Sequence, residues 1–187
     1  MKIGKKLFVP DRAAWRAWLR ANHRTANEIW LINYKVNSGK KGFTYDEAVE
    51  EALCYGWIDS IIKGLDETKF AQRYSPRRPG SQLSETNRER VRRLVKAGKM
   101  TKAGLEAISH AYRLNEKAKR LIVAPDILKE LKKNEQAWSN FRRLPAAYKR
   151  IRIGWIEMAR SRDSVFRQRL TYFVKMTARN KRFGMVR

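Results

Sequence analysis

Apolar residues recur at helical spacing early in the chain and then change to a strand pattern. Trp15, Trp18 and Leu19 fall on one face of a helix predicted over residues 11–22, with an aspartate at its N-cap. Residues 28–34 are rich in β-branched and aromatic side chains and are apolar on both faces, which predicts a central strand. The chain therefore opens with mixed α and β structure.

Capping signals predict the next elements. Thr44 followed by Glu47 is a capping box that opens a second helix, and Gly56 can end it. Residues 57–63 and 68–75 then have the composition of two strands joined by a short polar turn, which predicts a β-hairpin.

From Ser84 onward the pattern is helical. Ser84 and Thr101 are the expected caps of two helices, and prolines separate the helices that follow. These later helices are expected over residues 126–133, 135–143, 146–160 and 163–179. The predicted fold class is α+β, with an N-terminal mixed module containing a small antiparallel sheet (1–114) and an all-helical C-terminal module (115–187).

Composition supports a globular chain. Apolar residues make up 43% of the 187 and include six tryptophans, which excludes a disordered chain. The longest uncharged apolar runs fall far short of the ~20 residues that a membrane span needs, so no transmembrane segment is expected. The basic N-terminus lacks an apolar stretch behind it, so we expect no secretory signal and a cytoplasmic location.

Charge is the strongest deviation from an ordinary composition. Lys and Arg number 43 against 18 Asp and Glu, for a net charge of +25. The excess is small in residues 1–66 and large in 67–120 and 121–187. Such an excess is typical of proteins with a polyanionic partner, DNA or RNA first of all. The alternative is a proteome in which most proteins are basic.

Motifs for catalysis or metal binding are absent from the sequence. A single cysteine, Cys54, excludes an internal disulfide and a cysteine zinc cage, and its apolar surroundings favour an inert core thiol. His23 and His110 are too far apart to suggest a shared metal site, and both are interpreted as structural. No catalytic residue, metal or cofactor is predicted.

A candidate anion pocket lies around the predicted hairpin. A register centred on the hairpin turn places Asp59 opposite Arg73, where an ion pair is expected. Arg77 and Arg78 leave the sheet just before the helix N-terminus at Ser84, where backbone N–H groups and guanidinium groups could bind phosphate or carboxylate. The alternative is purely structural, with Asp59 holding Arg73 and the polar side chains capping the helix. The pocket residues are Trp57, Asp59, Arg73, Arg77, Arg78, Ser84 and Asn87.

A second candidate surface is a basic ridge on the helix that follows Ser84. Arg88, Arg92 and Lys96 repeat every four residues, opposite an apolar face. Such ridges suit phosphate backbones, and without a recognisable DNA-binding motif the binding would be sequence-independent. The alternative is a solvated helix face. The full ridge is Arg88, Arg92, Arg93, Lys96 and Lys99.

Several runs resemble the YdeI/OmpD-associated family of bacterial proteins. Residues 8–112 carry most of the resemblance, and the tail from Pro125 resembles the family's helical C-terminal segment. Leu83 stands where the family usually has Trp, and Val165 and Phe166 replace a usual Thr-Arg pair. The runs are 8–10, 15–19, 29–31, 45–59, 73–78 and 97–104, with Ser84 and Asn87.

The resemblance implies a cytoplasmic bacterial protein that protects against bacteriocins or cationic antimicrobial peptides, and it supplies no reaction, cofactor or catalytic residue. We therefore expect a non-enzymatic protein that binds an anionic partner, most of all nucleic acid. Two alternatives stay open, a small-anion-binding protein or enzyme built on the Asp/Arg/Ser pocket, and a protein-interaction scaffold. The oligomeric state is not determined by the sequence.

Overall fold

The computed structural model describes residues 2–40, 42–114 and 120–184. The chain divides into two compact units. The N-terminal unit comprises residues 1–83 and 90–114, and the C-terminal unit comprises residues 84–89 and 115–187. The expected domain boundary at 114/115 adjoins residues outside the described ones, and it stays a prediction.

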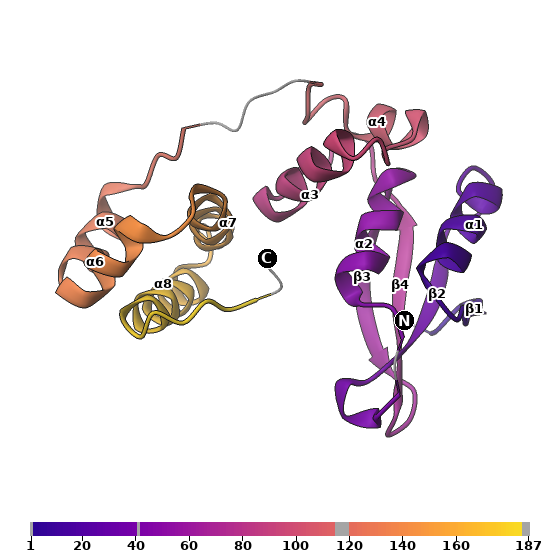
Figure 1. Ribbon diagram of the computed structural model, residues 1–187, viewed down its shortest axis with the longest axis horizontal. Coiled ribbons are helices and arrows are strands. Elements are labelled where there is room, and N and C mark those ends of the chain that lie inside the picture. The colour runs from indigo at the N-terminus through magenta and orange to yellow at the C-terminus, as the bar shows by residue number, and fades with distance from the viewer. Residues whose placement is uncertain (1, 41, 115–119, 185–187) are drawn as a thin grey trace. The chain divides into compact units, whose positions relative to one another are not determined.

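The N-terminal unit contains a mixed sheet (Figure 1). Its strands are β1 (Lys6–Leu7), β2 (Ile29–Tyr34), β3 (Trp57–Gly64) and β4 (Lys69–Pro76), in the order β1-β2-β4-β3. The predicted hairpin is confirmed as β3 and β4, and β2 is central as predicted. The sheet is not purely antiparallel, because β1 pairs with β2 in parallel. A two-residue strand is too short to leave an alternating pattern in the sequence.

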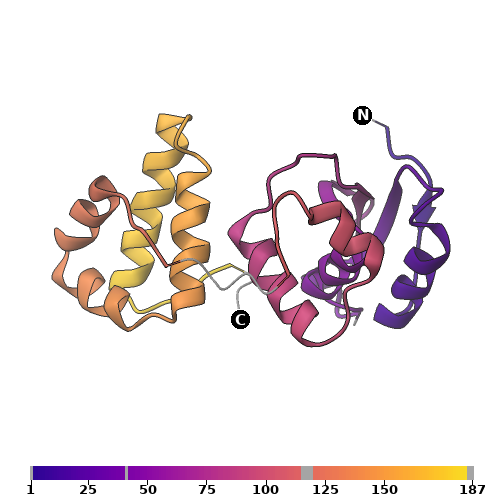
Figure 2. The ribbon, with the colours of Figure 1, turned by 90° about the horizontal axis from the view of Figure 1, so that it is seen from above.

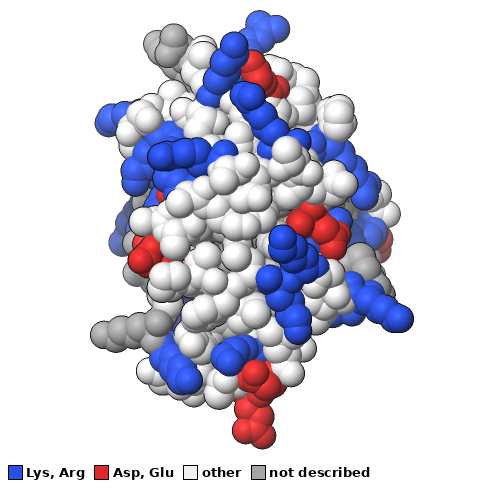
Figure 3. All heavy atoms as spheres, turned by 90° about the vertical axis from the view of Figure 1, so that its right-hand side faces the viewer, with Lys and Arg blue, Asp and Glu red and all other residues white. Residues whose placement is uncertain are grey.

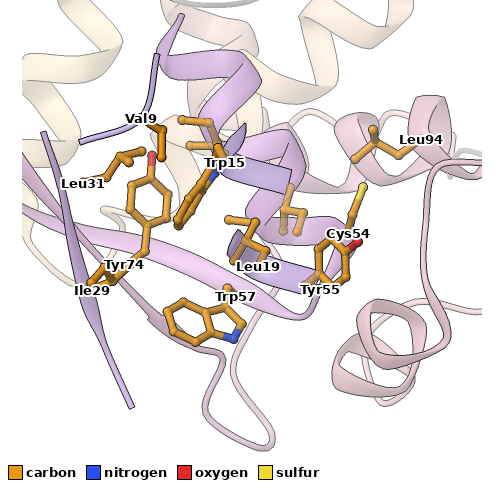
Figure 4. Packing of buried hydrophobic residues seen from close by; sticks show 14 residues of the cluster. Val9, Trp15, Leu19, Ile29, Leu31, Cys54, Tyr55, Trp57, Tyr74 and Leu94 are labelled. Atoms are coloured by element: carbon orange, nitrogen blue, oxygen red, sulfur yellow. The ribbon is translucent and has the colours of Figure 1, made fainter. Parts of the chain in front are cut away.

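Helices α1 (Arg12–Asn22) and α2 (Tyr45–Cys54) contribute several side chains to the main core of this unit, and α3 (Glu85–Lys96) adds Leu94. Trp15 and Leu19 of α1 are fully buried, and they pack with Trp57 and Tyr74 of the sheet (Figure 4). The predicted caps are confirmed, since the Asp11 side chain accepts from the N–H of Ala14 at 2.8 Å and α2 opens with the Thr44–Glu47 capping box. A 3-10 turn, η1 (Val36–Ser38), precedes α2.

Acidic side chains of α2 bind arginines from two other helices. Glu51, only 2% exposed, accepts from Arg12 Nε at 2.6 Å and from Arg16 Nη1 at 2.5 Å. Asp46 pairs in the same way with Arg90 of α3 (Glu85–Lys96). Burying a carboxylate is tolerated only where charge-assisted hydrogen bonds replace its hydration, so these pairs fix the helices around α2.

Close backbone approach positions α4 (Lys102–Ile108) against the end of α2. The carbonyl oxygen of Cys54 accepts from the backbone N–H of Thr101 at 3.1 Å and from its hydroxyl at 2.6 Å. A Cβ atom on Gly104 would lie 2.2 Å from that same oxygen. Only glycine fits there, because real Cβ atoms do not approach an oxygen so closely.

The C-terminal unit contains a bundle of helices (Figures 1 and 2). They are α5 (Pro125–Lys132), α6 (Glu135–Arg143), α7 (Ala146–Glu157) and α8 (Asp163–Ala178), close to the predicted bounds. Asn140, itself buried, donates to the carbonyl of Thr177 at 2.9 Å and so ties α6 to the end of α8. The α+β fold class is confirmed.

None of the helices in the described ranges is both long enough and apolar enough to span a bilayer.

Gly104→Ala is expected to lower the stability of the N-terminal unit by about 3 kcal/mol, because the added methyl group clashes with backbone that cannot give way. Denaturant unfolding followed by circular dichroism measures the effect. Gly64→Ala is the matched control, because a Cβ on Gly64 meets nothing within 4 Å. Equal midpoints for the two variants would contradict the close approach.

Glu51→Gln is expected to destabilise the protein by about 3 kcal/mol, because it removes the buried carboxylate that Arg12 and Arg16 share and leaves Arg16 without an ion-pair partner among the described residues, whereas Arg12 keeps Glu50. The control is Glu67→Gln, since Glu67 is exposed. Urea unfolding at neutral pH compares the two, and a change of less than about 0.5 kcal/mol for Glu51→Gln argues against the ion-pair network as a fixing element.

Candidate functional site

The strand register separates Asp59 from Arg73. Asp59 pairs with Tyr74 across the hairpin, and the register shifts between Asp59 and Ile62. A shift of one residue turns a side chain to the other face of a sheet. Arg73 instead donates from Nε to Glu28 at 2.7 Å. The prediction of an Asp59–Arg73 ion pair is therefore wrong. The register shift that separates the two residues leaves no pattern in the sequence.

Asp59 takes part in a polar network under α2 instead. Its Oδ2 atom accepts from the Tyr45 hydroxyl at 2.8 Å and from Gln72 Nε2 at 2.9 Å, and Tyr74 donates to Gln72 at 3.4 Å. Burial raises the pKa of Tyr45 and of Tyr74, so both phenols stay protonated donors. The carboxylate thus connects α2 to the sheet.

The other pocket residues have separate structural partners. Trp57 is buried in the core and its Nε1 donates to the carbonyl of His23 at 3.1 Å. Arg77 donates from Nη2 to the carbonyl of Gln82 at 2.9 Å. Burial lowers the pKa of Arg77, and its Nε is buried without a partner.

The Ser84 hydroxyl accepts from the N–H of Asn87 at 3.3 Å, as a helix cap does, and Arg78 is exposed. Within the N-terminal unit, the pocket residues Asp59, Arg73 and Arg77 thus bind different partners. The role of the seven pocket residues as anion ligands stays a prediction.

The basic ridge on α3 is partly neutralised. Arg88 pairs with Glu85 at 3.5 Å and Arg93 with Glu50 at 3.1 Å, whereas Lys96 and Lys99 are exposed. Arg92 is partly buried. On the face drawn in Figure 3, Lys and Arg are interspersed with Asp, Glu and uncharged residues rather than gathered in one patch. Polyanion binding by this ridge stays a prediction.

Cys54 and the histidines have the structural surroundings expected of them. Cys54 is buried, and burial raises the pKa of its thiol to about 11. His23 is the C-cap of α1, with Nδ1 2.9 Å from the carbonyl of Leu19. Across the described ranges, no group of three or more His, Cys, Asp or Glu residues could hold a metal ion.

Aromatic and arginine side chains meet on one side of the C-terminal unit, a cluster that the sequence did not reveal. A backbone turn after α8 brings Phe183 into this cluster. Asn180 takes a positive φ of 52°, and the N–H of Lys181 donates to the carbonyl of Met176 at 2.9 Å. This left-handed helix end reverses the chain. The N–H of Phe183 then donates to the Tyr148 hydroxyl of α7 at 3.1 Å.

Arg152 is the centre of this aromatic–arginine cluster. Its guanidinium carbon lies 4.5 Å from the ring centre of Phe183, 5.3 Å from that of Tyr148 and 6.0 Å from that of Trp155. The residue is 6% exposed, its Nε has no hydrogen-bond partner among the described residues, and burial lowers its pKa. Stacking on rings gives the cation some stabilisation but leaves N–H donors unused.

Two more arginines border the same rings. Arg169 lies 4.7 Å from the ring centre of Trp155 and donates to its carbonyl at 2.5 Å, and Arg182 lies 5.8 Å from that of Tyr148. Tyr172, 44% exposed, packs edge-on to Phe183 with ring centres 4.8 Å apart. The cluster comprises Tyr148, Arg152, Trp155, Arg169, Tyr172, Arg182 and Phe183.

No carboxylate among the described residues pairs with these three arginines. The acids of the helices α5, α7 and α8 pair with other cations instead. These pairs are Asp126–Arg160, Glu157–Arg160, Glu130–Lys133 and Asp163–Arg167. The cluster is therefore cationic and partly exposed, and its rings and guanidinium groups can bind an anion with a flat group attached.

A spacing signal for the cluster was present in the sequence. Tyr148, Arg152 and Trp155 lie at i, i+4 and i+7, and Arg169 and Tyr172 at i and i+3, so each set shares a helix face. None of these residues was singled out as a site residue from the sequence, because the same spacing also fits an ordinary helix with a buried face. The turn that adds Phe183 left no such signal.

Two family models match different parts of the chain. Residues 7–107 match the family model described as Domain of unknown function (DUF8412), which is more than half of the chain. The chain belongs to this family. Residues 120–180 match the family model described as Bacteriocin-protection, YdeI or OmpD-Associated. No curated protein and no solved structure matches the chain.

The resemblance to the YdeI/OmpD-associated family is thus confirmed over the C-terminal part. It was expected to rest mainly on residues 8–112, and nearly all of that stretch matches the DUF8412 model instead. The aromatic–arginine cluster, apart from Arg182 and Phe183, lies within the YdeI/OmpD-associated match.

Cys54 is expected to react with a thiol reagent at pH 8 only after unfolding, because with a pKa of about 11 very little of the buried thiol is ionised. A time course with a chromogenic disulfide, with and without guanidinium chloride, measures the reaction. Stoichiometric labelling of the folded protein within seconds would show that the thiol is accessible and ionised.

Proposed function

We propose that the protein binds single-stranded nucleic acid without sequence preference, through the aromatic–arginine cluster of its C-terminal unit. The observation that carries the proposal is Arg152, a buried guanidinium among aromatic rings that has, within the described residues, an unused N–H donor and no carboxylate partner. A phosphate is the anion that a planar guanidinium binds best, through two parallel hydrogen bonds.

Exposed rings favour a single strand over a duplex. Tyr172 is 44% exposed, and Trp155 and Phe183 are partly exposed. Unpaired bases stack on such rings with ~1–3 kcal/mol per base, whereas in a duplex the base faces are already stacked. Every base has a π face, so binding of this kind is tolerant of sequence.

Further exposed cations lie on the C-terminal unit. Arg179 and Lys181 are exposed around the end of α8, and Arg142 and Arg143 end α6. Their positive charge adds to the attraction of this unit for a phosphate backbone. The ridge on α3 is the weaker candidate, because two of its arginines pair with glutamates.

The biological setting of the proposal comes from the family description at residues 120–180, which names bacteriocin protection. We place the protein in the cytoplasm, with a role in stress or bacteriocin protection that needs binding rather than catalysis. A small-anion site at Arg77 is less well supported, because Nη2 of that guanidinium already binds the loop at residues 81–82.

Fluorescence anisotropy with a labelled oligothymidylate of about 15 nucleotides tests the proposal. Affinity is expected to fall steeply between about 50 and 200 mM salt, because each phosphate contact on a single strand contributes a slope of about 0.7. Oligoadenylate is expected to bind within a few-fold of oligothymidylate. No anisotropy change at the lowest salt, or no salt dependence, would overturn the proposal.

Two matched pairs of variants locate the site. Tyr172→Ala is expected to weaken binding about tenfold and Tyr172→Phe to leave it nearly unchanged, because only the ring stacks. Arg182→Gln is expected to reduce the salt slope by about 0.7, whereas Arg167→Gln, outside the cluster and paired with Asp163, leaves it unchanged. Equal losses within either pair would place the binding elsewhere.

A further inference from the structure

A cleft of about 770 Å³ lies along α8 in the C-terminal unit. None of the residues that line it belongs to the aromatic–arginine cluster. Phe166, Leu170, Val174 and Ala178 follow one another every four residues and form an apolar floor on one face of α8. From first to last they span ~18 Å of helix. Residues of α5 line the cleft as well. The volume falls in the range of small-ligand sites, ~300–1,000 Å³.

Every carboxylate that lines this cleft is neutralised by the chain itself. The pairs are Asp126 with Arg160 at 2.8 Å, Glu130 with Lys133 at 2.6 Å, and Asp163 with Arg167 at 2.9 Å. A cationic ligand would have to compete with these arginines and the lysine, so the cleft is not suited to one.

Cations without partners line the same cleft. Lys175 and Arg179 are exposed one turn apart near the last floor residue, and Lys129 is exposed on α5; among the described residues none of the three has an ion-pair partner. Asn134 also lines the cleft, and its side-chain Oδ1 accepts from the N–H of Ala137 at 2.8 Å, while its side-chain amide nitrogen has no hydrogen-bond partner among the described residues. Donors for an anion therefore gather there. The last carbonyl groups of α8 carry partial negative charge and repel an anion, so the attraction must come from the side chains of Lys175 and Arg179.

We propose that this cleft binds a single-chain anionic amphiphile, with the alkyl chain on the floor of α8 and the carboxylate on Lys175 and Arg179. The long apolar floor fits an alkyl chain, and the free cations fit its head group. A cavity of this size can enclose most of such a small ligand, whereas an acidic amphipathic helix would leave most of its side chains outside it. The inference does not rest on nucleic-acid binding.

Isothermal titration calorimetry of the full chain with sodium dodecanoate, below its micelle concentration, tests the proposal. Dodecanoate is expected to bind at one site, and uncharged dodecanol at least about tenfold more weakly, because it lacks the charge-assisted hydrogen bonds. Equal affinity for the two probes, or no binding of dodecanoate, would overturn the proposal.

Variants locate the probe with controls on the same unit. Lys175→Gln with Arg179→Gln is expected to weaken dodecanoate binding about tenfold, whereas Arg142→Gln with Arg143→Gln, exposed and outside the cleft, removes the same charge without effect. Thr171→Trp places a ring over the cleft and is expected to block binding. Gln168→Trp adds the same ring to α8 outside the cleft lining and is expected to leave binding intact.

Circular dichroism confirms that each variant is folded. If Gln168→Trp blocks as well as Thr171→Trp does, or the two double variants weaken binding equally, the ligand lies elsewhere and the proposal fails. If an acidic amphipathic peptide binds and dodecanoate does not, the cleft is a helix groove and the proposal fails.

Discussion

The buried carboxylate of Glu51 is the constraint on which the N-terminal unit depends. Arg12 and Arg16 bind it from α1, at 2.6 and 2.5 Å, and the neighbouring acids of α2 bind arginines of α3. Removing the Glu51 carboxylate leaves Arg16 without an ion-pair partner among the described residues, so these pairs hold α1 against α2 in one arrangement. Part of the basic excess of the chain is therefore structural.

The arginines of the C-terminal unit have different partners. Acids of α5, α7 and α8 pair with Arg160, Arg167 and Lys133. Arg152, Arg169 and Arg182 have aromatic neighbours instead. A guanidinium that stacks on a ring keeps its N–H groups free for an external anion. This difference is why we place polyanion binding in the C-terminal unit rather than on α3, although both carry dense positive charge.

The candidate site was harder to predict than the fold. Helices followed from caps and periodicity, as at Asp11 and at the Thr44–Glu47 capping box, because these signals act within one turn of chain. The predicted Asp59–Arg73 ion pair was wrong, because the register irregularity after Asp59 gave that side chain Tyr45 and Gln72 as partners. The short strand β1 was not predicted, because two residues are too few to show an alternating pattern.

The sequence by itself determined the α+β class, most element bounds, the net charge and the buried stripes, because these depend on local propensity and spacing. Tertiary structure alone decided which cations are neutralised. Arg93 and Arg182 look alike in sequence, yet one pairs with Glu50 of another helix and the other lies by Tyr148. Partners far apart along the chain meet only through strand register and through turns such as that at Asn180, and a linear pattern does not encode those distances.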